Sequence, residues 1–274
     1  MKGYIMNKSY PKLDHLKSIM SKMDAVIVAF SGGVDSTFLL KTAKDALGNN
    51  VLAVTAESSA QPTNELRETK KIAAELEVEH IFVQTNELED KEFTANPTNR
   101  CYLCKSKIYS EVKKVADEKK IEFIIEGSNA DDVNDYRPGL TALEELGILS
   151  PLKQAGLTKS EIRKLSKSMG LPTWDKPALA CLASRIPYGS EITHEKLRRI
   201  DKAESFLREN GFKQVRVRDH QEIARIEIEK ENLDKILENN FYSIVVKKFK
   251  DLGYSYVTID LEGYRTGSMN INLD

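Results

Sequence analysis

Residues 25–36 read Ala-Val-Ile-Val-Ala-Phe-Ser-Gly-Gly-Val-Asp-Ser, and this stretch decides the fold. An apolar run, Ala25–Phe30, ends at a small polar loop, Ser31–Ser36, and a helical pattern then continues to a glycine stop at Gly48. A strand, a glycine loop and a helix in this order direct backbone N–H groups and the positive end of the helix towards a bound anion. The stretch therefore predicts a phosphate-binding loop after a buried strand. The simpler alternative is an ordinary strand-to-helix turn.

The residues of this loop suit a nucleotide phosphate. Gly32 and Gly33 permit a close approach and unusual dihedral angles. Ser31 and Ser36 add hydroxyl donors, and no lysine follows, so the loop differs from the common P-loop. Ser-Gly-Gly-x-Asp-Ser resembles the signature of the ATP-pyrophosphatase (PP-loop) family, which holds the leaving pyrophosphate when ATP is cut between its α and β phosphates. This resemblance implies ATP with Mg²⁺ as cofactors and makes Asp35 the candidate Mg²⁺ ligand.

Strand-like runs alternate with helical patterns over the first half of the chain. The apolar runs are Ala25–Phe30, Val51–Ala56, His80–Val83 and Ile121–Glu126, and the helical patterns between them are Ser36–Leu47, Thr63–Leu76 and Cys104–Lys119. Because these strands are continuously apolar, they indicate a parallel sheet covered on both faces. We therefore predict an α/β fold, a doubly wound parallel sheet with its ligand at the carboxyl ends of the strands.

The pattern changes between residues 170 and 190, where three prolines and the only tryptophan occur without a clear period. A charged helix, Thr193–Glu209, follows, and then a strand pair, two short helices and a last strand, Tyr254–Leu261. This order predicts a smaller C-terminal α+β domain. We expect a PP-loop ATP-pyrophosphatase domain at residues 1–185 and a substrate-binding or oligomerisation domain at residues 186–274.

The composition limits the class of protein. Of the 274 residues, 41% are hydrophobic and 30% are charged, which is typical of a soluble globular protein. The net charge of −1 gives no global electrostatic reason to expect nucleic acid as a partner. No apolar run approaches the roughly 20 residues of a membrane span. Three cysteines, an odd number, argue against a disulfide scaffold and for the reducing cytoplasm.

The three cysteines form the second informative pattern. Cys101 and Cys104 are three positions apart, and Cys181 follows much later in the chain. Four interpretations remain open: a redox disulfide of the first two, a zinc site completed by a histidine, buried inert thiols, and an iron–sulfur cluster. Three thiolates would leave one iron of a cluster open to a further ligand such as sulfide. An ATP-activating loop in the same chain favours the cluster, because sulfur is a natural nucleophile for an adenylated oxygen.

Other polar residues are candidates for the same site. Gly127, Ser128 and Asn129 follow a predicted strand and could complete the ATP site, although a simple polar turn is the alternative. Asp131, Asp132 and Asp135 could hold Mg²⁺, although acidic loops are usually only solvated.

Three arginines are candidates for the substrate. Strand alternation places Arg216 and Arg218 on one face, where they would suit a substrate phosphate or form cross-strand ion pairs. Arg185, four residues from Cys181, is a candidate for a substrate carboxylate or phosphate.

Four pieces of the sequence together resemble the LarE-type sulfur transferases, which mature the nickel-pincer nucleotide of lactate racemase. The pieces are the loop Ser31–Ser36, the segment Glu126–Asp132 with Asp135–Gly139, the segment Cys181–Arg185, and the segment Gly263–Asn270. The resemblance spans nearly the whole chain. It implies a small-molecule substrate, pyridinium-3,5-dicarboxylate mononucleotide, whose carboxylates are adenylated and become thiocarboxylates, and it implies a homo-oligomer.

The resemblance also bears on the source of sulfur. One branch of the family sacrifices the sulfur of the cysteine at the position of Cys181 and lacks the earlier pair. This chain has Cys101 and Cys104 and so resembles the other branch, in which three cysteines hold a 4Fe–4S cluster. The sequence leaves open whether Cys181 gives up its sulfur or only binds a cluster. It also leaves open what donates sulfide.

Three other functions fit parts of the pattern. A tRNA thiolase also pairs a PP-loop with three cysteines, but the near-zero net charge and the lack of a basic arm count against it. A PP-loop ligase that uses ammonia leaves the cysteines unexplained. A sensor that binds nucleotide and metal without catalysis is the alternative from another class.

Overall fold

The computed structural model describes residues 10–134, 138–177, 181–265 and 268–269. The chain forms two compact units, and each is described here by itself. The first unit contains residues 1–57, 64–85 and 101–176, and the second contains residues 58–63, 86–100 and 177–274. Among the described residues, no helix combines the length and the apolar character needed to cross a bilayer.

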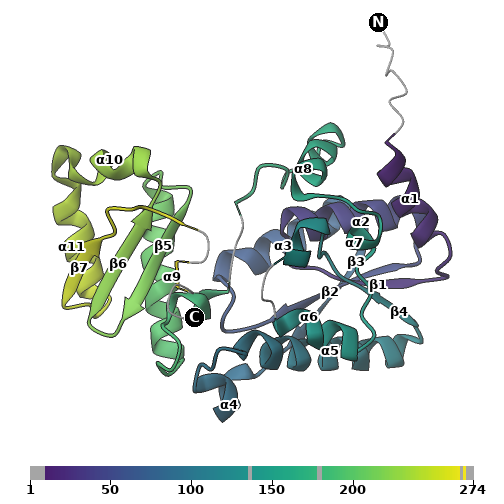
Figure 1. Ribbon diagram of the computed structural model, residues 1–274, viewed down its shortest axis with the longest axis horizontal. Coiled ribbons are helices and arrows are strands. Elements are labelled where there is room, and N and C mark those ends of the chain that lie inside the picture. The colour runs from purple at the N-terminus through teal and green to yellow at the C-terminus, as the bar shows by residue number, and fades with distance from the viewer. Residues whose placement is uncertain (1–9, 135–137, 178–180, 266–267, 270–274) are drawn as a thin grey trace, which may run out of the picture. The chain divides into compact units, whose positions relative to one another are not determined.

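The first unit is built on a four-stranded sheet (Figure 1). Its strands are β1 (Val26–Ala29), β2 (Val51–Glu57), β3 (Glu79–Gln84) and β4 (Phe123–Ile125). The strand order is β3-β2-β1-β4, and every pairing is parallel. The first strand therefore lies between β2 and β4, so the loops that follow β1 and β4 leave the same edge of the sheet side by side.

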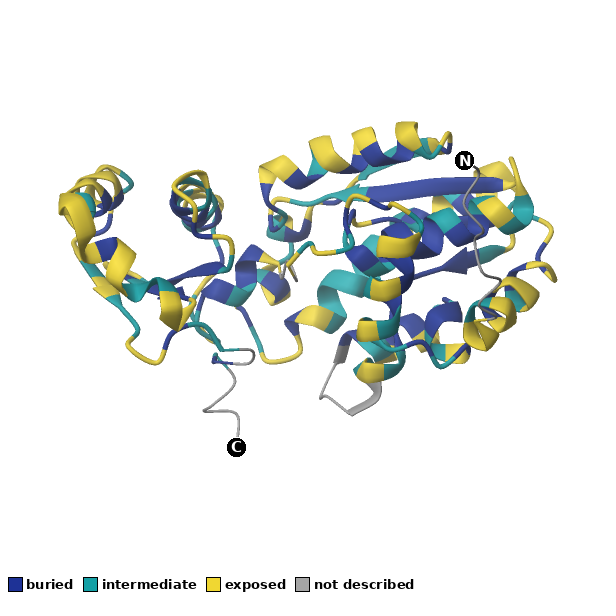
Figure 2. Ribbon diagram, turned by 90° about the horizontal axis from the view of Figure 1, so that it is seen from above, coloured by how far each residue is buried: buried dark blue, intermediate teal, exposed yellow. Residues whose placement is uncertain are grey.

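Both faces of this sheet are covered. Val26 and Val28 face a core shared with helices α1, α2, α3, α7 and α8, whereas Ile27 and Val54 face a second core shared with α5 and α6. The helices are α1 (Pro11–Met20), α2 (Val34–Leu47), α3 (Thr63–Glu75), α5 (Arg100–Lys119), α6 (Pro138–Glu145), α7 (Pro151–Gln154) and α8 (Lys159–Ser168). Strands β1 and β2 are buried along most of their length, whereas β3 is only half-buried (Figure 2). This arrangement confirms the predicted doubly wound α/β fold.

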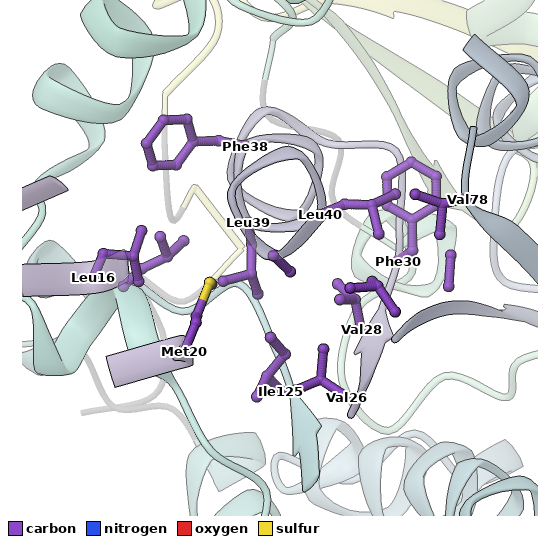
Figure 3. Close-up of a cluster of buried hydrophobic side chains, with 14 of the residues drawn as sticks. Leu16, Met20, Val26, Val28, Phe30, Phe38, Leu39, Leu40, Val78 and Ile125 are labelled. Carbon is purple, nitrogen blue, oxygen red and sulfur yellow. The ribbon is translucent and has the colours of Figure 1, made fainter. Parts of the chain in front are cut away.

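The core beside α2 explains why this helix is fixed so firmly behind the loop. Figure 3 shows Leu39 and Leu40 on the side of α2 that faces Val26 and Val28 of β1, whereas Phe38 projects from the helix away from this strand. All five residues are fully buried. The first turn of α2 therefore starts from a rigid position at the end of β1.

The second unit carries a smaller mixed sheet, as the sequence predicted. Its strands are β5 (Val215–His220), β6 (Ile223–Ile228) and β7 (Tyr256–Ile259), in the order β5-β6-β7, with β5 antiparallel and β7 parallel to β6. Its helices are α4 (Lys91–Thr94), α9 (His194–Glu209), α10 (Leu233–Leu237) and α11 (Phe241–Asp251). One face of the sheet, with Val215 and Val217, packs in an apolar core, and the alternate residues of β5 lie on the other face.

Two elements differ from the sequence-based expectation. A helix, α1, precedes the first strand, and Leu16 and Met20 bury it against α2. Helix α5 begins at Arg100 rather than at Cys104, because the buried Arg100 side chain donates to the Asn96 Oδ1 at 2.7 Å. Cys101 therefore lies within the first turn of the helix, which the sequence had predicted to begin at Cys104.

Candidate functional site

The loop between β1 and α2 forms a compact turn of small polar groups. The hydroxyl oxygens of Ser31 and Ser36 are 3.1 Å apart, and the Ser36 hydroxyl donates to the Gly33 carbonyl at 3.3 Å. Gly32 has a φ of +70°, and a Cβ there would lie 2.8 Å from the Thr69 Cγ2 of α3. Only glycine fits at this position, both for its dihedral angle and for its neighbour.

The segment after β4 closes on this loop. A Cβ at Gly127 would lie 3.1 Å from the Ser36 backbone nitrogen and 3.3 Å from the Asp35 Cβ. Beside it, the buried carboxylate of Glu126 accepts from the Ser128 backbone N–H at 3.0 Å and from the Ser128 hydroxyl at 2.9 Å. The predicted ATP-site segments Ser31–Ser36 and Gly127–Asn129 therefore lie against one another.

The rest of the segment is ordered by its own acidic residues. The Asn129 N–H donates to Asp132 at 2.9 Å, and the Asn129 side-chain oxygen accepts from the Asp131 N–H at 2.9 Å. Asp131 also accepts from the Lys159 backbone N–H at 2.8 Å. These contacts use the two aspartates to hold the turn; Asp135 lies outside the described residues.

Asp35 carries the acidic group of the loop. One oxygen of its carboxylate, Oδ2, accepts from the ammonium group of Lys159. The other, Oδ1, is buried without a hydrogen-bond partner. Burial raises the pKa of Asp35, and the Lys159 charge opposes that shift. A buried carboxylate oxygen with an open coordination position suits Mg²⁺, which binds oxygen ligands.

Lys159 is a candidate site residue that sequence reasoning missed. It is the first residue of α8. Thr158 and Glu161 cap the N-terminus of this helix in a capping box. The capping pattern could have located the helix start, but no local signal pairs Lys159 with a carboxylate 124 positions earlier. The ammonium group adds a cation to the phosphate-binding loop.

Two of the three cysteines share a helix, and the third belongs to the other unit. Cys101 is exposed and Cys104 is half-buried, and both project from α5 three positions apart, so they are neighbours on one helix face. Both belong to the first unit, whereas the exposed Cys181 belongs to the second. Within the described part of either unit, no three His, Cys, Asp or Glu side chains gather as a metal site.

The Arg185 side chain is fixed by hydrogen bonds within the second unit. Its side chain is 0% exposed, and it makes a bidentate pair with the equally buried Glu204 of α9, at 2.7 and 2.9 Å. Its remaining terminal nitrogen donates to the Cys181 carbonyl and to the Ser184 hydroxyl, each at 3.0 Å. The guanidinium group thus fixes the backbone beside Cys181.

The arginines of β5 are buried and not solvated. Arg216 is 3% exposed and Arg218 is 5% exposed. Arg218 pairs with Glu227 of β6 at 2.7 Å and donates to the Ser268 hydroxyl at 2.8 Å, while its Nε has no hydrogen-bond partner. Burial, and then the positive charge of Arg185, lower the pKa of Arg216 to about 10. Such a buried group of cations is favourable for an anion.

Known proteins are similar to this chain in sequence. The family described as "Queuosine biosynthesis protein QueC" matches residues 25–125. An uncharacterized protein of Synechocystis is 44% identical over 94% of this chain and 97% of its own. The pyridinium-3,5-bisthiocarboxylic acid mononucleotide synthase of Lactiplantibacillus plantarum is 38% identical over 94% of this chain and 93% of its own. An uncharacterized protein of Methanocaldococcus jannaschii is 33% identical over 89% and 92%, respectively.

A parallel sheet with the Ser31–Ser36 loop between β1 and α2 defines an enzyme of the PP-loop ATP-pyrophosphatase class. The similarity to the synthase extends beyond this class, because it covers both units of the chain. The chain belongs to the LarE-type family of ATP-dependent sulfur transferases.

Proposed function

We propose that the protein uses ATP to adenylate the carboxylates of pyridinium-3,5-dicarboxylate mononucleotide and converts them to thiocarboxylates for the nickel-pincer nucleotide cofactor. The close approach of Gly127 to the start of α2 is the observation that carries the ATP half of this proposal. The printed name of the Lactiplantibacillus relative supports the substrate.

In the ATP half, the residues of the loop bind and orient the pyrophosphate that leaves. Ser31, Gly33 and Ser36 provide hydroxyl and backbone donors at the positive end of α2. Asp35 holds Mg²⁺ through the oxygen that has no protein partner. Gly127, Ser128 and Asn129 shape the opposite wall, where Gly127 lets the two backbones approach.

In the sulfur half, Cys101, Cys104 and Cys181 would hold a 4Fe–4S cluster. The donor set fits, because thiolates are the ligands of such clusters and all three thiols are at least partly accessible. When bound, the cluster supplies the sulfide that replaces an oxygen of the activated carboxylate. The alternative is that Cys181 itself gives up its sulfur.

Protein purified without oxygen tests the sulfur half. Iron and acid-labile sulfide analysis and Mössbauer spectra will detect a cluster, and Cys101→Ser will remove it. A colourless protein that remains fully active with iron excluded contradicts the cluster. Intact mass after turnover separates the two sulfur sources, because sacrifice of Cys181 lowers the mass by about 34 Da, the mass of H₂S, in the manner of covalent cysteine chemistry.

The substrate is recognised by arginines of the second unit. We infer that Arg216 and Arg218 bind its phosphate and that Arg185 acts on the reaction through the Cys181 backbone that it holds. In this scheme residues 1–185 activate ATP, and residues 186–274 bind the substrate and form a homo-oligomer. The proposal also includes a separate sulfide donor. It places the protein in the cytoplasm, which suits reduced thiols, and gives nucleic acid no role.

Pyrophosphate release is the experiment that separates this function from its rivals. Release that requires the pyridinium mononucleotide supports the proposal. Release with bulk tRNA, accompanied by tRNA thiolation, identifies a tRNA thiolase instead. Binding of ATP without cleavage in the presence of either substrate identifies a sensor.

A further inference from the structure

Lys176 makes contacts that the ATP site described so far does not explain. Its ammonium group donates to the Gly32 carbonyl at 3.1 Å, to Glu65 at 2.7 Å and to Glu68 at 2.6 Å. The Lys176 side chain is 13% exposed and that of Glu65 is 10% exposed, whereas Glu68 is 52% exposed. One largely buried cation therefore joins α3 to the backbone of the phosphate-binding loop.

The segment that carries Lys176 is itself fixed. Arg163 of α8 donates to the Trp174 carbonyl at 2.8 Å and to the Lys176 carbonyl at 2.7 Å. Thr69 of α3 leaves no room for a Cβ at Gly32. Gly32 therefore lies against α3, and its carbonyl is bound by Lys176 of the 174–176 segment.

The direction of the Gly32 carbonyl has a consequence for the next residue. In a planar trans peptide the carbonyl of one residue and the N–H of the next point in opposite directions. Because the Gly32 carbonyl is turned to Lys176, the Gly33 N–H is turned away from it. Gly33 is the N-cap residue of α2, so its N–H belongs to the group of donors at the positive end of this helix.

We propose that Lys176 is a positioning residue for the pyrophosphate site: it orients the Gly32–Gly33 peptide so that the Gly33 N–H faces the β and γ phosphates of ATP. This inference rests on the proposed use of ATP at the loop. Lys176 acts through the peptide and does not bind the phosphates, since two carboxylates already surround its charge.

Equilibrium binding to the full-length protein, without sulfur substrate, tests this role. The probes are MgATP, magnesium pyrophosphate and AMP. Lys176→Met is expected to weaken MgATP and pyrophosphate binding roughly 10- to 100-fold, the range for a hydrogen bond to a charged group. AMP binding will stay unchanged, because AMP lacks the phosphates that the Gly33 N–H faces. Lys176→Arg, which keeps the charge and a donor, will recover most of the pyrophosphate affinity.

Two further variants control for stability. Lys176→Met leaves the buried Glu65 carboxylate without this cation, so the double variant with Glu65→Gln removes both charges and is expected to show the same selective loss. Lys167→Met removes another lysine of the first unit, one that lies over the Trp174 ring at 4.2 Å, and will leave all three affinities unchanged.

The outcomes distinguish the two levels of the proposal. If AMP affinity falls as far as pyrophosphate affinity, or if neither changes in folded Lys176 variants, the positioning role is wrong and the proposed function is untouched. If the wild-type protein binds neither MgATP nor pyrophosphate, the proposed function fails and this role fails with it.

Discussion

The carboxylate of Asp35 in the phosphate-binding loop is paired with the ammonium group of Lys159, 124 positions later in the chain. The pair occupies only one carboxylate oxygen, and the second oxygen is buried without a partner. Asp35 thus has two separable tasks in the proposed site, one towards Lys159 and one towards Mg²⁺.

Asp35→Asn is expected to reduce pyrophosphate release on the order of 100-fold, because the site loses the carboxylate that would hold Mg²⁺, the cation that offsets the charge of the reacting phosphates. Lys159→Met will weaken ATP binding but keep the dependence of the rate on Mg²⁺. The measurement is pyrophosphate release as a function of Mg²⁺ concentration. Asp45→Asn, in the same helix and paired with Lys41 at 2.5 Å, is the matched control.

A double-mutant cycle decides between the two tasks. If Asp35 only holds Lys159, the two single variants and the double variant will be equally impaired and will share one Mg²⁺ dependence. That result would contradict the assignment of Asp35 as the Mg²⁺ ligand.

The buried pair of Arg185 and Glu204 gives a prediction about stability. Burial alone would raise the pKa of Glu204, but Arg185 and then Arg208 reverse this, so its net pKa is lowered. Glu204→Gln leaves the buried Arg185 guanidinium without its counter-charge, and we expect a loss of about 3–5 kcal/mol in the free energy of unfolding. Urea denaturation measures this loss, and Glu209→Gln, exposed at the end of the same helix, will be nearly neutral.

The same pair also holds the Cys181 carbonyl through Arg185. The thiol of Cys181 in Glu204→Gln should therefore react with an alkylating reagent at a changed rate under conditions where the protein stays folded. An unchanged rate together with unchanged stability would show that the pair does not fix the segment.

Much of the ATP site was predictable because its signals are local or follow from topology. The apolar run before Ser31 fixes a strand, and Gly32 and Gly33 fix the turn after it. Gly127 follows β4, and β4 lies next to β1 in the sheet. Ligands bind at the carboxyl ends of parallel strands, and this rule predicts that the two segments belong to one site.

The remaining contacts had no local signal. Lys159 and Lys176 reach carboxylates 124 and 111 positions away. Lys159 stands on the amphipathic helix α8, where a lysine usually lies on the solvated face, and Lys176 lies in a loop without any period. Strand alternation placed Arg216 and Arg218 on one face of β5, but it could not predict that this face is buried. Arg218 is covered by Ser184, in a short 3-10 helix, and by Ser268, in a turn. Segments this short have no sequence period that would predict the contact.

Arg218 gives a prediction about the substrate. Arg218→Lys keeps the positive charge beside Glu227 but loses the planar fork that matches a phosphate. We expect it to raise the KM for the pyridinium mononucleotide roughly 10-fold, the loss of about one strong hydrogen bond, while the affinity for MgATP is unchanged. Kinetics with the phosphate-free nucleoside provide the comparison, since its KM should not respond. Arg198→Lys, exposed on α9, is the control, and an equal effect on both substrates would contradict phosphate binding.

His80 gives a prediction about pH. It lies in β3 between Phe30 and Phe82, with ring centroids at 5.7 and 4.3 Å, and its Nε2 is 2.8 Å from the Thr55 hydroxyl. Burial, and then the charge of Lys70, lower the pKa of His80 to about 4. The unfolded chain takes up a proton near the ordinary pKa of about 6.5, whereas the folded protein does not, so protonation favours unfolding.

Stability should therefore fall as the pH drops from 6.5 towards 4 and should not change through this group above 6.5. Urea midpoints across this range measure the effect. His80→Gln will flatten the pH dependence, although it lowers stability at pH 7 because packing against the two phenyl rings is lost. His15→Gln, at an exposed position of α1, should retain the full wild-type slope. If His80→Gln retained that slope as well, the pH dependence would have to come from the carboxylates of the fold, and the neutral state of the His80 ring would not contribute to it.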